Sequence, residues 1–214
     1  MHNVKKRRLF ENDDHSAGGG IYLQTGRMPP PFEFELLSDA YRETAAVAVQ
    51  ALAHDEMFIR AGAGSTAFRA LSVIFLYRQA LELILKSIIL TGARVLDAEE
   101  AALQIALKEH NFEKLRPLIE QVLSATGLGW NFGVAGLRSL ADFRRLLAEF
   151  DAFDPNSTVC RYPVDNSGNP AIEVERTFNL FNFAEAIDEK LEALSASFAK
   201  FAYAARGTRS SLSR

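Results

Sequence analysis

The sequence has a single cysteine, Cys160, and no long apolar run. One cysteine excludes an intrachain disulfide, so the fold does not require an oxidising compartment. A helix that crosses a bilayer needs about 20 consecutive apolar residues, whereas the densest apolar stretch, Ala70 to Tyr77, ends at Arg78. The basic run at residues 5–8 is not followed by the apolar core of a signal peptide. We therefore expect a cytoplasmic protein without a membrane partner.

The usual signatures of metal and phosphate sites are also missing. The four histidines are scattered, and neither a His-Glu-x-x-His nor a Cys-x-x-Cys motif occurs. The segment Gly62-x-Gly64-Ser65-Thr66 precedes a predicted helix, but it lacks the lysine of a P-loop and a preceding strand. A turn followed by a helix N-cap explains it. We therefore predict no metal ion and no cofactor.

The overall composition is that of an ordinary globular protein. The 214 residues are 48% hydrophobic and 24% charged, which excludes a wholly disordered or collagen-like chain. The formal net charge is −3, so the molecule as a whole is not attracted to nucleic acid or to an anionic membrane. A local basic patch is still compatible with this charge.

Apolar residues at helical spacing predict an all-α bundle of five or six helices. Ser38 is the expected N-cap of the first helix, and Gly92 is the expected C-terminal glycine of the second. Pro117 is expected to kink the fourth helix or to shift its start. The predicted ranges are 38–60, 65–90, 97–110, a helix opened by Asn111, 136–152 and 179–204.

Three segments depart from the helical pattern. Residues 1–31 are rich in glycine, proline and charge, which predicts a flexible N-terminal arm, and residues 205–214 are expected to be a flexible polar tail. Residues 153–176 are rich in turn formers, and a short hairpin is expected around Asn166–Asn169. A loop of this length inside a compact domain is often functional. The helical domain is therefore expected to span residues 37–204.

The second predicted helix carries an unusual set of charges. It is apolar on almost all sides from Phe68 to Leu90, which predicts a central, buried helix. Arg78, Glu82 and Lys86 nevertheless lie in it at four-residue spacing, which brings them onto one face beside Gln79. Buried charges need partners. Either the three residues pair with one another as an internal ion ladder, or they form a polar seam that lines a pocket or an interface.

Three further polar segments are candidates to meet this polar seam (Arg78, Glu82 and Lys86). They are His110-Asn111, Asp151–Ser157 and Arg161-Tyr162-Pro163. In the last, the guanidinium of Arg161 suits a planar anion such as phosphate, and the ring of Tyr162 suits the face of a base. The alternative is that Arg161 pairs with Asp154 or Asp165 and only fixes the loop.

Together these segments resemble the HEPN superfamily, small helical-bundle proteins named for prokaryotic and eukaryotic nucleotide binding. The resemblance covers roughly residues 37–204. It is carried by Tyr77-Arg78-Gln79-Ala80-Leu81-Glu82-Leu83-Ile84-Leu85-Lys86, by His110-Asn111-Phe112-Glu113-Lys114-Leu115, and by Cys160-Arg161-Tyr162-Pro163 before the last long helix.

Many HEPN proteins are metal-independent ribonucleases, and toxins of toxin–antitoxin or phage-defence systems are common among them. Their catalytic pattern is an arginine followed after four to six residues by a histidine, near the start of the last helix. Here Arg176 is followed at those distances by Phe181, Asn182 and Phe183. The sequence is therefore more similar to nucleotide-binding HEPN domains without the catalytic pair. That resemblance implies a ligand or partner held by Arg78, Glu82, Lys86, His110, Arg161 and Tyr162.

We accordingly expect a non-catalytic module that binds a nucleotide, RNA or a protein partner, such as an antitoxin or a defence component, in a bacterial stress or phage-defence setting. One alternative is a divergent metal-independent ribonuclease with His110 and Arg161 as its catalytic residues. Another is a structural scaffold. The resemblance also implies a tendency to form homodimers through the helices.

Overall fold

The computed structural model describes residues 30–56, 58, 65–96, 103–104, 107–125, 127, 129–165, 167–172 and 177–212. Five named helices lie within these ranges: α1 Pro30–Ala53, α3 Ser65–Leu96, α5 Phe112–Ala125, α6 Leu140–Phe153 and α7 Leu180–Leu212. No β-strand occurs in the described part, and the predicted all-α class is confirmed. Residues 1–29, the break at residues 61–64 and the expected helix start at Asp97 lie outside the described residues.

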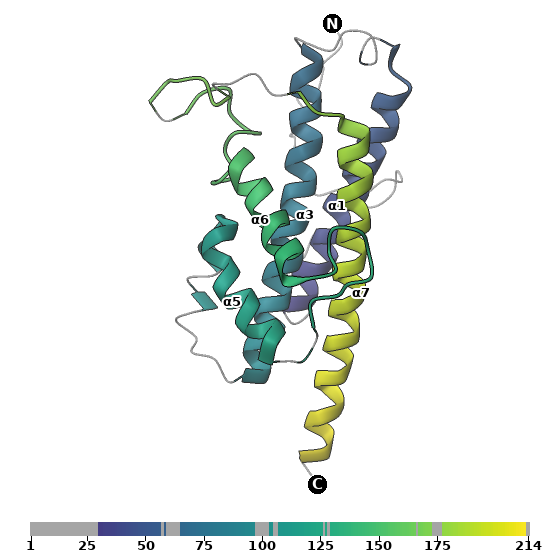
Figure 1. Cartoon of the computed structure of the whole chain (residues 1–214), viewed down its shortest axis with the longest axis vertical. Helices are drawn as coiled ribbons and strands as arrows, with labels where there is room; N and C mark the ends of the chain where they lie inside the picture. The colour runs from purple at the N-terminus through teal and green to yellow at the C-terminus, as the bar shows by residue number, and fades with distance from the viewer. Residues whose placement is uncertain are drawn as a thin grey trace, which may run out of the picture.

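The helix α3 is the centre of the bundle. It contacts α1, α5 and α7, while α5 also contacts α6 and α1 also contacts α7. In Figure 1 the long helices α1, α3 and α7 run along the long axis of the molecule, and the shorter α5 and α6 lie to one side. Every residue from Ala80 to Ala93 is buried. The predicted central, buried helix is therefore present.

The first helix begins earlier than predicted, at Pro30 instead of after Ser38. Proline is tolerated in the first turn of a helix, because the N–H groups there have no intrahelical partner. Ser38 is buried inside α1, and its hydroxyl donates to the carbonyl of Ala80 on α3 at 2.7 Å. Ser87 makes the reverse connection, from α3 to the carbonyl of Pro31 at 2.6 Å. Ser38 is thus an inter-helix contact and not a cap.

Gly92 does not end the second predicted helix, because α3 continues to Leu96. A Cβ atom on Gly92 would lie 2.1 Å from Cγ1 of Val122 on α5. This distance is far inside van der Waals contact, so the glycine is needed for the close approach of α5 and not for a helix end.

Two side chains from outside the helix hold the start of α5. The carboxylate of Asp151 on α6 accepts the N–H groups of Phe112 at 3.0 Å and of Glu113 at 2.6 Å. Asn111 accepts the N–H of Lys114 at 3.1 Å, so it opens this helix as predicted. Pro117 lies inside α5 and neither delays its start nor ends it. With its first turn anchored in this way, the helix continues through the proline.

The last two helices differ from prediction at one end each. α6 begins at Leu140, after the N-cap Ser139, and not near Gly136, which lies in the preceding loop with φ +70°. α7 begins after Asn179, whose side chain accepts two N–H groups of the first turn. It continues to Leu212, so the tail expected from residue 205 is helical that far. No helix in the described ranges is both long and apolar enough to cross a bilayer.

The long loop between α6 and α7 has the turn that its sequence predicts. Val164 and Pro170 form an isolated antiparallel bridge. Inside it, the N–H of Asp165 donates to the carbonyl of Asn169 at 2.8 Å. The Asp165 carboxylate accepts the N–H groups of Ser167 and Asn169, which holds its pKa below the usual value. The aspartate therefore organises its own turn.

Candidate functional site

The polar seam on α3 is buried and is bonded internally. Arg78 is 0% exposed, Glu82 2% and Lys86 3%. The Glu82 carboxylate accepts from Nη1 of Arg78 at 3.1 Å and from Nζ of Lys86 at 2.8 Å. Of the two sequence interpretations, the internal ion ladder matches these contacts.

Further donors of the two cations bond to backbone carbonyls of other segments. Arg78 donates through Nε to the carbonyl of Asp154 at 3.1 Å and through Nη2 to that of His110 at 2.6 Å. Its guanidinium lies over the ring of Phe112, 4.7 Å from the centroid. Nζ of Lys86 donates to the carbonyl of Leu107 at 2.9 Å. The seam therefore joins α3 to the start of α5 and to the end of α6.

His110 belongs to the same network, but its side chain reaches the surface. Its Nδ1 lies 2.8 Å from Oε1 of Glu82, and the side chain is 55% exposed. Because an ionised Glu82 carboxylate can only accept, Nδ1 is the donor in this contact. Among the described members of the network, His110 is the one whose side chain is mostly exposed.

Arg161 and Tyr162 lie apart from this network on an exposed part of the loop. Arg161 donates through Nε to the carbonyl of Ser157. Its guanidinium lies 5.8 Å from the ring centroid of Phe75 and 5.6 Å from that of Tyr162. The six predicted site residues are thus divided into a connected group of four, of which Arg78, Glu82 and Lys86 are buried, and a separate exposed pair.

The suggested pairing of Arg161 with Asp154 or Asp165 is wrong. Asp154 is fully buried, and its Oδ1 accepts the N–H groups of Thr158 at 2.6 Å and Val159 at 3.0 Å. Its ionic partner is Arg78, whose Nε lies 4.0 Å from Oδ2. Asp165 is occupied by its own turn. Sequence proximity favoured a local pair, whereas the central helix supplies the cation from 76 residues away.

Cys160 is a partly buried thiol next to this aspartate. Burial, together with the negative charge of Asp154, raises the pKa of the Cys160 thiol to about 12. The thiolate is the nucleophilic form of cysteine. We therefore expect the Cys160 thiol to keep its proton at neutral pH and to be a weak nucleophile.

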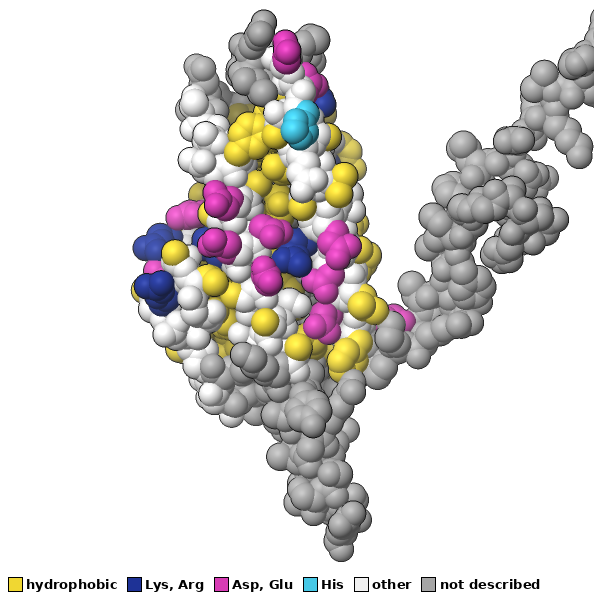
Figure 2. Space-filling view, turned by 90° about the vertical axis from the view of Figure 1, so that its right-hand side faces the viewer, with side chains coloured by type: hydrophobic (Ala, Val, Ile, Leu, Met, Phe, Trp, Pro, Cys, Tyr) yellow, Lys and Arg dark blue, Asp and Glu magenta, His cyan; other side chains and the backbone are white. Residues whose placement is uncertain are grey.

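One face of the bundle is predominantly acidic. Figure 2 shows acidic side chains gathered near the middle of this face. On α1 and α7, Arg42 lies 3.6 Å from Asp188 and 3.9 Å from Glu192. Burial raises the pKa of Glu35, and the nearby negative charge of Asp39 raises it further. Burial is also the main cause of the raised pKa values of Asp39 and Asp188. The middle of this face is therefore mainly acidic among the described residues, which does not favour contact with nucleic acid there.

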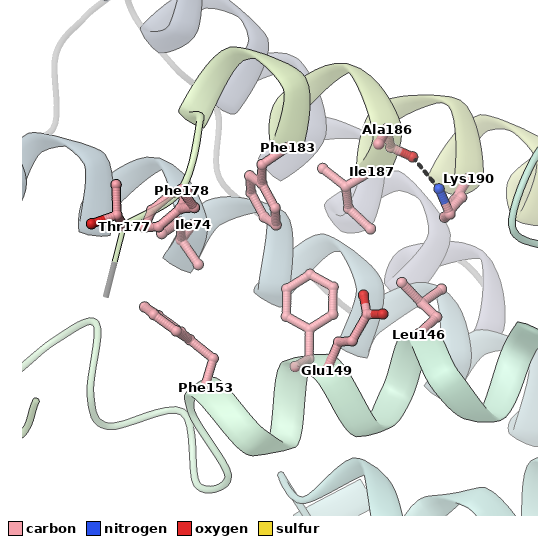
Figure 3. Close-up of a pocket in the computed structure, with 11 residues that line it drawn as sticks. Ile74, Leu146, Glu149, Phe153, Thr177, Phe178, Phe183, Ala186, Ile187 and Lys190 are labelled. Carbon is pink, nitrogen blue, oxygen red and sulfur yellow. Dashed lines mark hydrogen bonds between the residues drawn. The ribbon is translucent and has the colours of Figure 1, made fainter. Parts of the chain in front are cut away.

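The structure contains a pocket that sequence analysis missed. It lies between α6 and α7, with α3 behind it, and has a volume of about 610 Å³. Figure 3 shows Phe183 and Ile187 projecting from α7 toward Leu146 and Glu149 on α6. Its lining residues are mostly apolar: Ile74, Leu146, Glu149, Phe150, Phe153, Thr177, Phe178, Phe183, Ala186, Ile187 and Lys190.

Aromatic rings form the walls of this pocket and pack on one another edge to face. Phe183 lies between Phe150 and Phe178, with centroid distances of 6.0 Å and 6.3 Å. Phe153 meets Phe178 at 6.3 Å. Such contacts hold rings in fixed orientations. The pocket is therefore a preformed aromatic surface.

A sequence signal for the pocket existed. Phe150 and Phe153 end one helix, and Phe178 and Phe183 flank the start of the next, on either side of the long loop. Phe183 and Ile187 lie four residues apart on α7 and form part of an apolar stripe along one face of this helix. Only tertiary packing shows that part of this stripe borders a cavity.

Comparison with known proteins gives no relative for this chain. No protein family, no curated protein and no solved structure matches it significantly. Within the described residues, no group of three or more His, Cys, Asp or Glu side chains is arranged to hold a metal ion.

Proposed function

We propose that this chain is a non-catalytic binding module that takes up its ligand in the aromatic pocket between α6 and α7. The observation that carries the proposal is a cavity of about 610 Å³ lined mainly by apolar side chains, four of them phenylalanines. Small-molecule sites are typically concave and mostly apolar, with volumes of roughly 300–1,000 Å³ and a few polar groups. The pocket has all of these properties.

The polar seam is a poor candidate for the ligand site. The donors of Arg78 and Lys86 already bond to Glu82 and to three backbone carbonyls, and both side chains are buried. A phosphate would have to replace these bonds and leave buried carbonyls unpaired, at about 1–3 kcal/mol each. The seam is better explained as the structural support of the bundle.

A nucleotide, the ligand class expected from the sequence, would enter the pocket by its base. The faces of aromatic side chains stack with bases and tolerate any base. Lys190 is the one cation among the described lining residues, so a monophosphate is a better match than a triphosphate. The bacterial stress or phage-defence setting is proposed with this function.

The test is a thermal-shift panel on the purified protein, with nucleoside monophosphates, ATP, GTP, dinucleotides, short RNA and small apolar molecules. A ligand at about 100 times its Kd adds about 2.7 kcal/mol to the stability of the folded state. For a protein of this size, the melting temperature rises by roughly 5–10 °C. Ala186, an exposed residue that lines the pocket, is replaced in the variant Ala186→Trp to fill it.

The control is Ala196→Trp, because Ala196 is also exposed on α7 but does not line the pocket. We expect a stabilising ligand whose effect is lost in Ala186→Trp and kept in Ala196→Trp. A stabilising ligand that is unaffected by Ala186→Trp and lost in Arg161→Ala would place the site on the loop and overturn the proposal. A flat panel would also overturn it, in favour of a scaffold.

A second candidate function has one specific observation in its favour, the contact between His110 and Glu82. A mostly exposed histidine that is oriented by a buried carboxylate has the arrangement of a general base. Such a base could remove the proton of a ribose hydroxyl in a metal-independent ribonuclease. Arg161, the other expected catalytic residue, bonds to Ser157 instead of to His110.

RNA cleavage by the wild type, His110→Ala, Arg161→Ala and His54→Ala tests this candidate. His54 is an exposed histidine on another part of the chain and serves as the matched control. Cleavage that is lost in His110→Ala and kept in His54→Ala supports the ribonuclease. Absence of cleavage by the wild type, or cleavage unchanged in both His110→Ala and Arg161→Ala, rules it out.

A further inference from the structure

Lys190 stands at one end of the pocket without an acidic partner. Its Nζ donates to the carbonyl of Ala186 at 2.9 Å, which Figure 3 shows as a dashed line. Among the described residues, no carboxylate lies within ion-pair distance of Nζ. An ammonium group has three donors, so two are left for a ligand.

The lysine stem also passes close to the loop before α6. Its Cε lies 3.3 Å from the position that a Cβ atom of Gly136 would occupy, so Gly136 leaves room for it. The ammonium group itself is held by its bond to the Ala186 carbonyl.

Glu149, on the opposite wall, is the other charged residue of the lining, but unlike Lys190 it is mostly exposed and has a partner of opposite charge. Its side chain is 70% exposed, and its Oε1 lies 4.0 Å from Nε of Arg145. Water screens the Glu149 charge, and Arg145 partly offsets it. Lys190 is only partly exposed and has no such compensation. The charge at this end of the pocket therefore favours a negative headgroup.

The rest of the pocket favours an apolar tail. Phe153 and Phe178 lie at the end away from Lys190, and Phe183 and Ile187 lie between the two ends (Figure 3). Each methylene that moves from water into such surroundings increases affinity roughly fourfold. A pocket with a polar end and an apolar end fits a ligand that is itself divided in this way.

We infer that the ligand of this pocket is a single-chain carboxylate amphiphile and not the nucleotide expected from the sequence, with the carboxylate at Lys190 and the hydrocarbon tail among the phenylalanine rings. This inference rests on the proposed function, since it names the ligand class of the same pocket. The bond formed is a charge-assisted hydrogen bond between Nζ and a carboxylate oxygen, which is about twice as strong as a neutral one.

The experiment compares three ligands with equal tails, octanoate, octanol and octylamine, by isothermal titration calorimetry below their aggregation concentrations. We expect octanoate to bind the wild type about tenfold more tightly than octylamine, with octanol between them. Lys190→Met keeps the apolar stem and removes the charge, so it should abolish the preference for octanoate and leave the affinity for octanol within about twofold.

Two matched variants complete the test. Lys114→Met removes an exposed lysine on α5 that pairs with Glu109, and it should leave all three affinities unchanged. Glu149→Gln should tighten octanoate binding.

If octylamine binds as tightly as octanoate, or if Lys190→Met keeps the preference, the inference is wrong and the pocket as a ligand site still stands. If none of the three ligands binds, while an aromatic ligand is lost on Ala186→Trp, the inference alone fails; if no ligand depends on the pocket, the proposed function fails with it.

Discussion

Nη2 of Arg78 donates a 2.6 Å hydrogen bond to the carbonyl oxygen of His110, 32 residues later in the chain. The same guanidinium bonds to the carbonyl of Asp154 and to the carboxylate of Glu82. One side chain thereby joins the central helix, the start of α5 and the end of α6. Only arginine has the planar fork of donors that serves three acceptors in fixed directions. The bundle therefore depends on this residue more than a single ion pair would suggest.

Replacement of Arg78 by methionine should destabilise the protein by about 3–5 kcal/mol, because it leaves Glu82 without one of its partners and two carbonyls unpaired. Urea unfolding followed by circular dichroism measures the change. Arg145→Met, which removes an exposed arginine of α6, is the control and should cost at most about 1 kcal/mol. A change in Arg78→Met no larger than in the control would contradict the bridging role.

The double variant Arg78→Met/Glu82→Leu separates an ion pair from a structural bridge. Replacement of a buried ion pair by apolar residues is often nearly neutral. Here the carbonyls of His110 and Asp154 lose their donor in the double variant as they do in Arg78→Met. We therefore expect the double variant to stay less stable than the wild type by about 2 kcal/mol or more. If the double variant were as stable as the wild type, Arg78 and Glu82 would act only as an ion pair and not as a bridge between segments.

Gly92→Ala should destabilise the protein by about 1–3 kcal/mol through overpacking, although alanine is the better helix former. The reason is the 2.1 Å distance from the added Cβ to Cγ1 of Val122. The melting temperature of the variant measures the effect. Val122→Ala removes the clashing atoms, so the double variant should be more stable than the sum of the two single changes predicts. Additive single effects would mean that α5 does not depend on this contact.

Cys160 should react slowly with iodoacetamide while the protein is folded. Its pKa of about 12, compared with 9.0 for a free thiol, leaves little thiolate at pH 8. We expect alkylation roughly 100-fold slower than in the urea-unfolded chain. Because the folded thiol keeps its proton longer than the unfolded one, its contribution to stability is present below pH 9.0 and is lost as the pH rises toward 12. Equal alkylation rates in the folded and unfolded protein would refute this description.

Two aspartates should respond to pH in opposite directions. Burial raises the pKa of Asp39, so the native state binds its proton more readily than the unfolded state, and this group contributes more stability as the pH falls from 7 toward 4. Asp39→Asn should therefore stabilise the protein slightly at pH 7, because water screens most of the effect at this partly exposed group, with a smaller gain near pH 4.

Asp165 provides the matched comparison, because hydrogen bonds from Asn169 and Ser167 lower its pKa. Its contribution is present above the unfolded pKa and is lost as the pH falls through the lower folded value. Asp165→Asn should therefore cost stability at pH 7 and cost little at pH 3. Thermal unfolding of both variants across this range checks the signs. Parallel profiles would show that neither pKa shift affects folding.

The sequence predicted the central helix and the shared face of its three charged residues because both follow from local periodicity. A spacing of four puts Arg78, Glu82 and Lys86 on one face whatever the rest of the chain does. The helix ends at Ser38 and Gly92 were wrong for a common reason. Serine and glycine are usual helix-end residues, but here each one serves a neighbouring helix, by a hydrogen bond or by the absence of a side chain.

The site was less accessible to prediction than the fold. Arg161 and the polar seam are separate because the Asp154 carboxylate turns inward to its own loop and to Arg78, which no local pattern indicates. The pocket is the gap left where two helices with large side chains do not fully close. Such a gap depends on the relative placement of α6 and α7, and a single sequence carries little information about that placement.

The two serine bonds between α1 and α3 run in opposite directions, from Ser38 to the carbonyl of Ala80 and from Ser87 to the carbonyl of Pro31. Their partners lie seven residues apart on each helix, which fixes an antiparallel register. The many alanines of α1 give its surface few large side chains that could stop one helix from sliding along the other. A slip of one turn, about 5.4 Å, would break both bonds together and leave two buried hydroxyls unpaired. These small residues therefore select one alignment of the helix pair among several of similar packing.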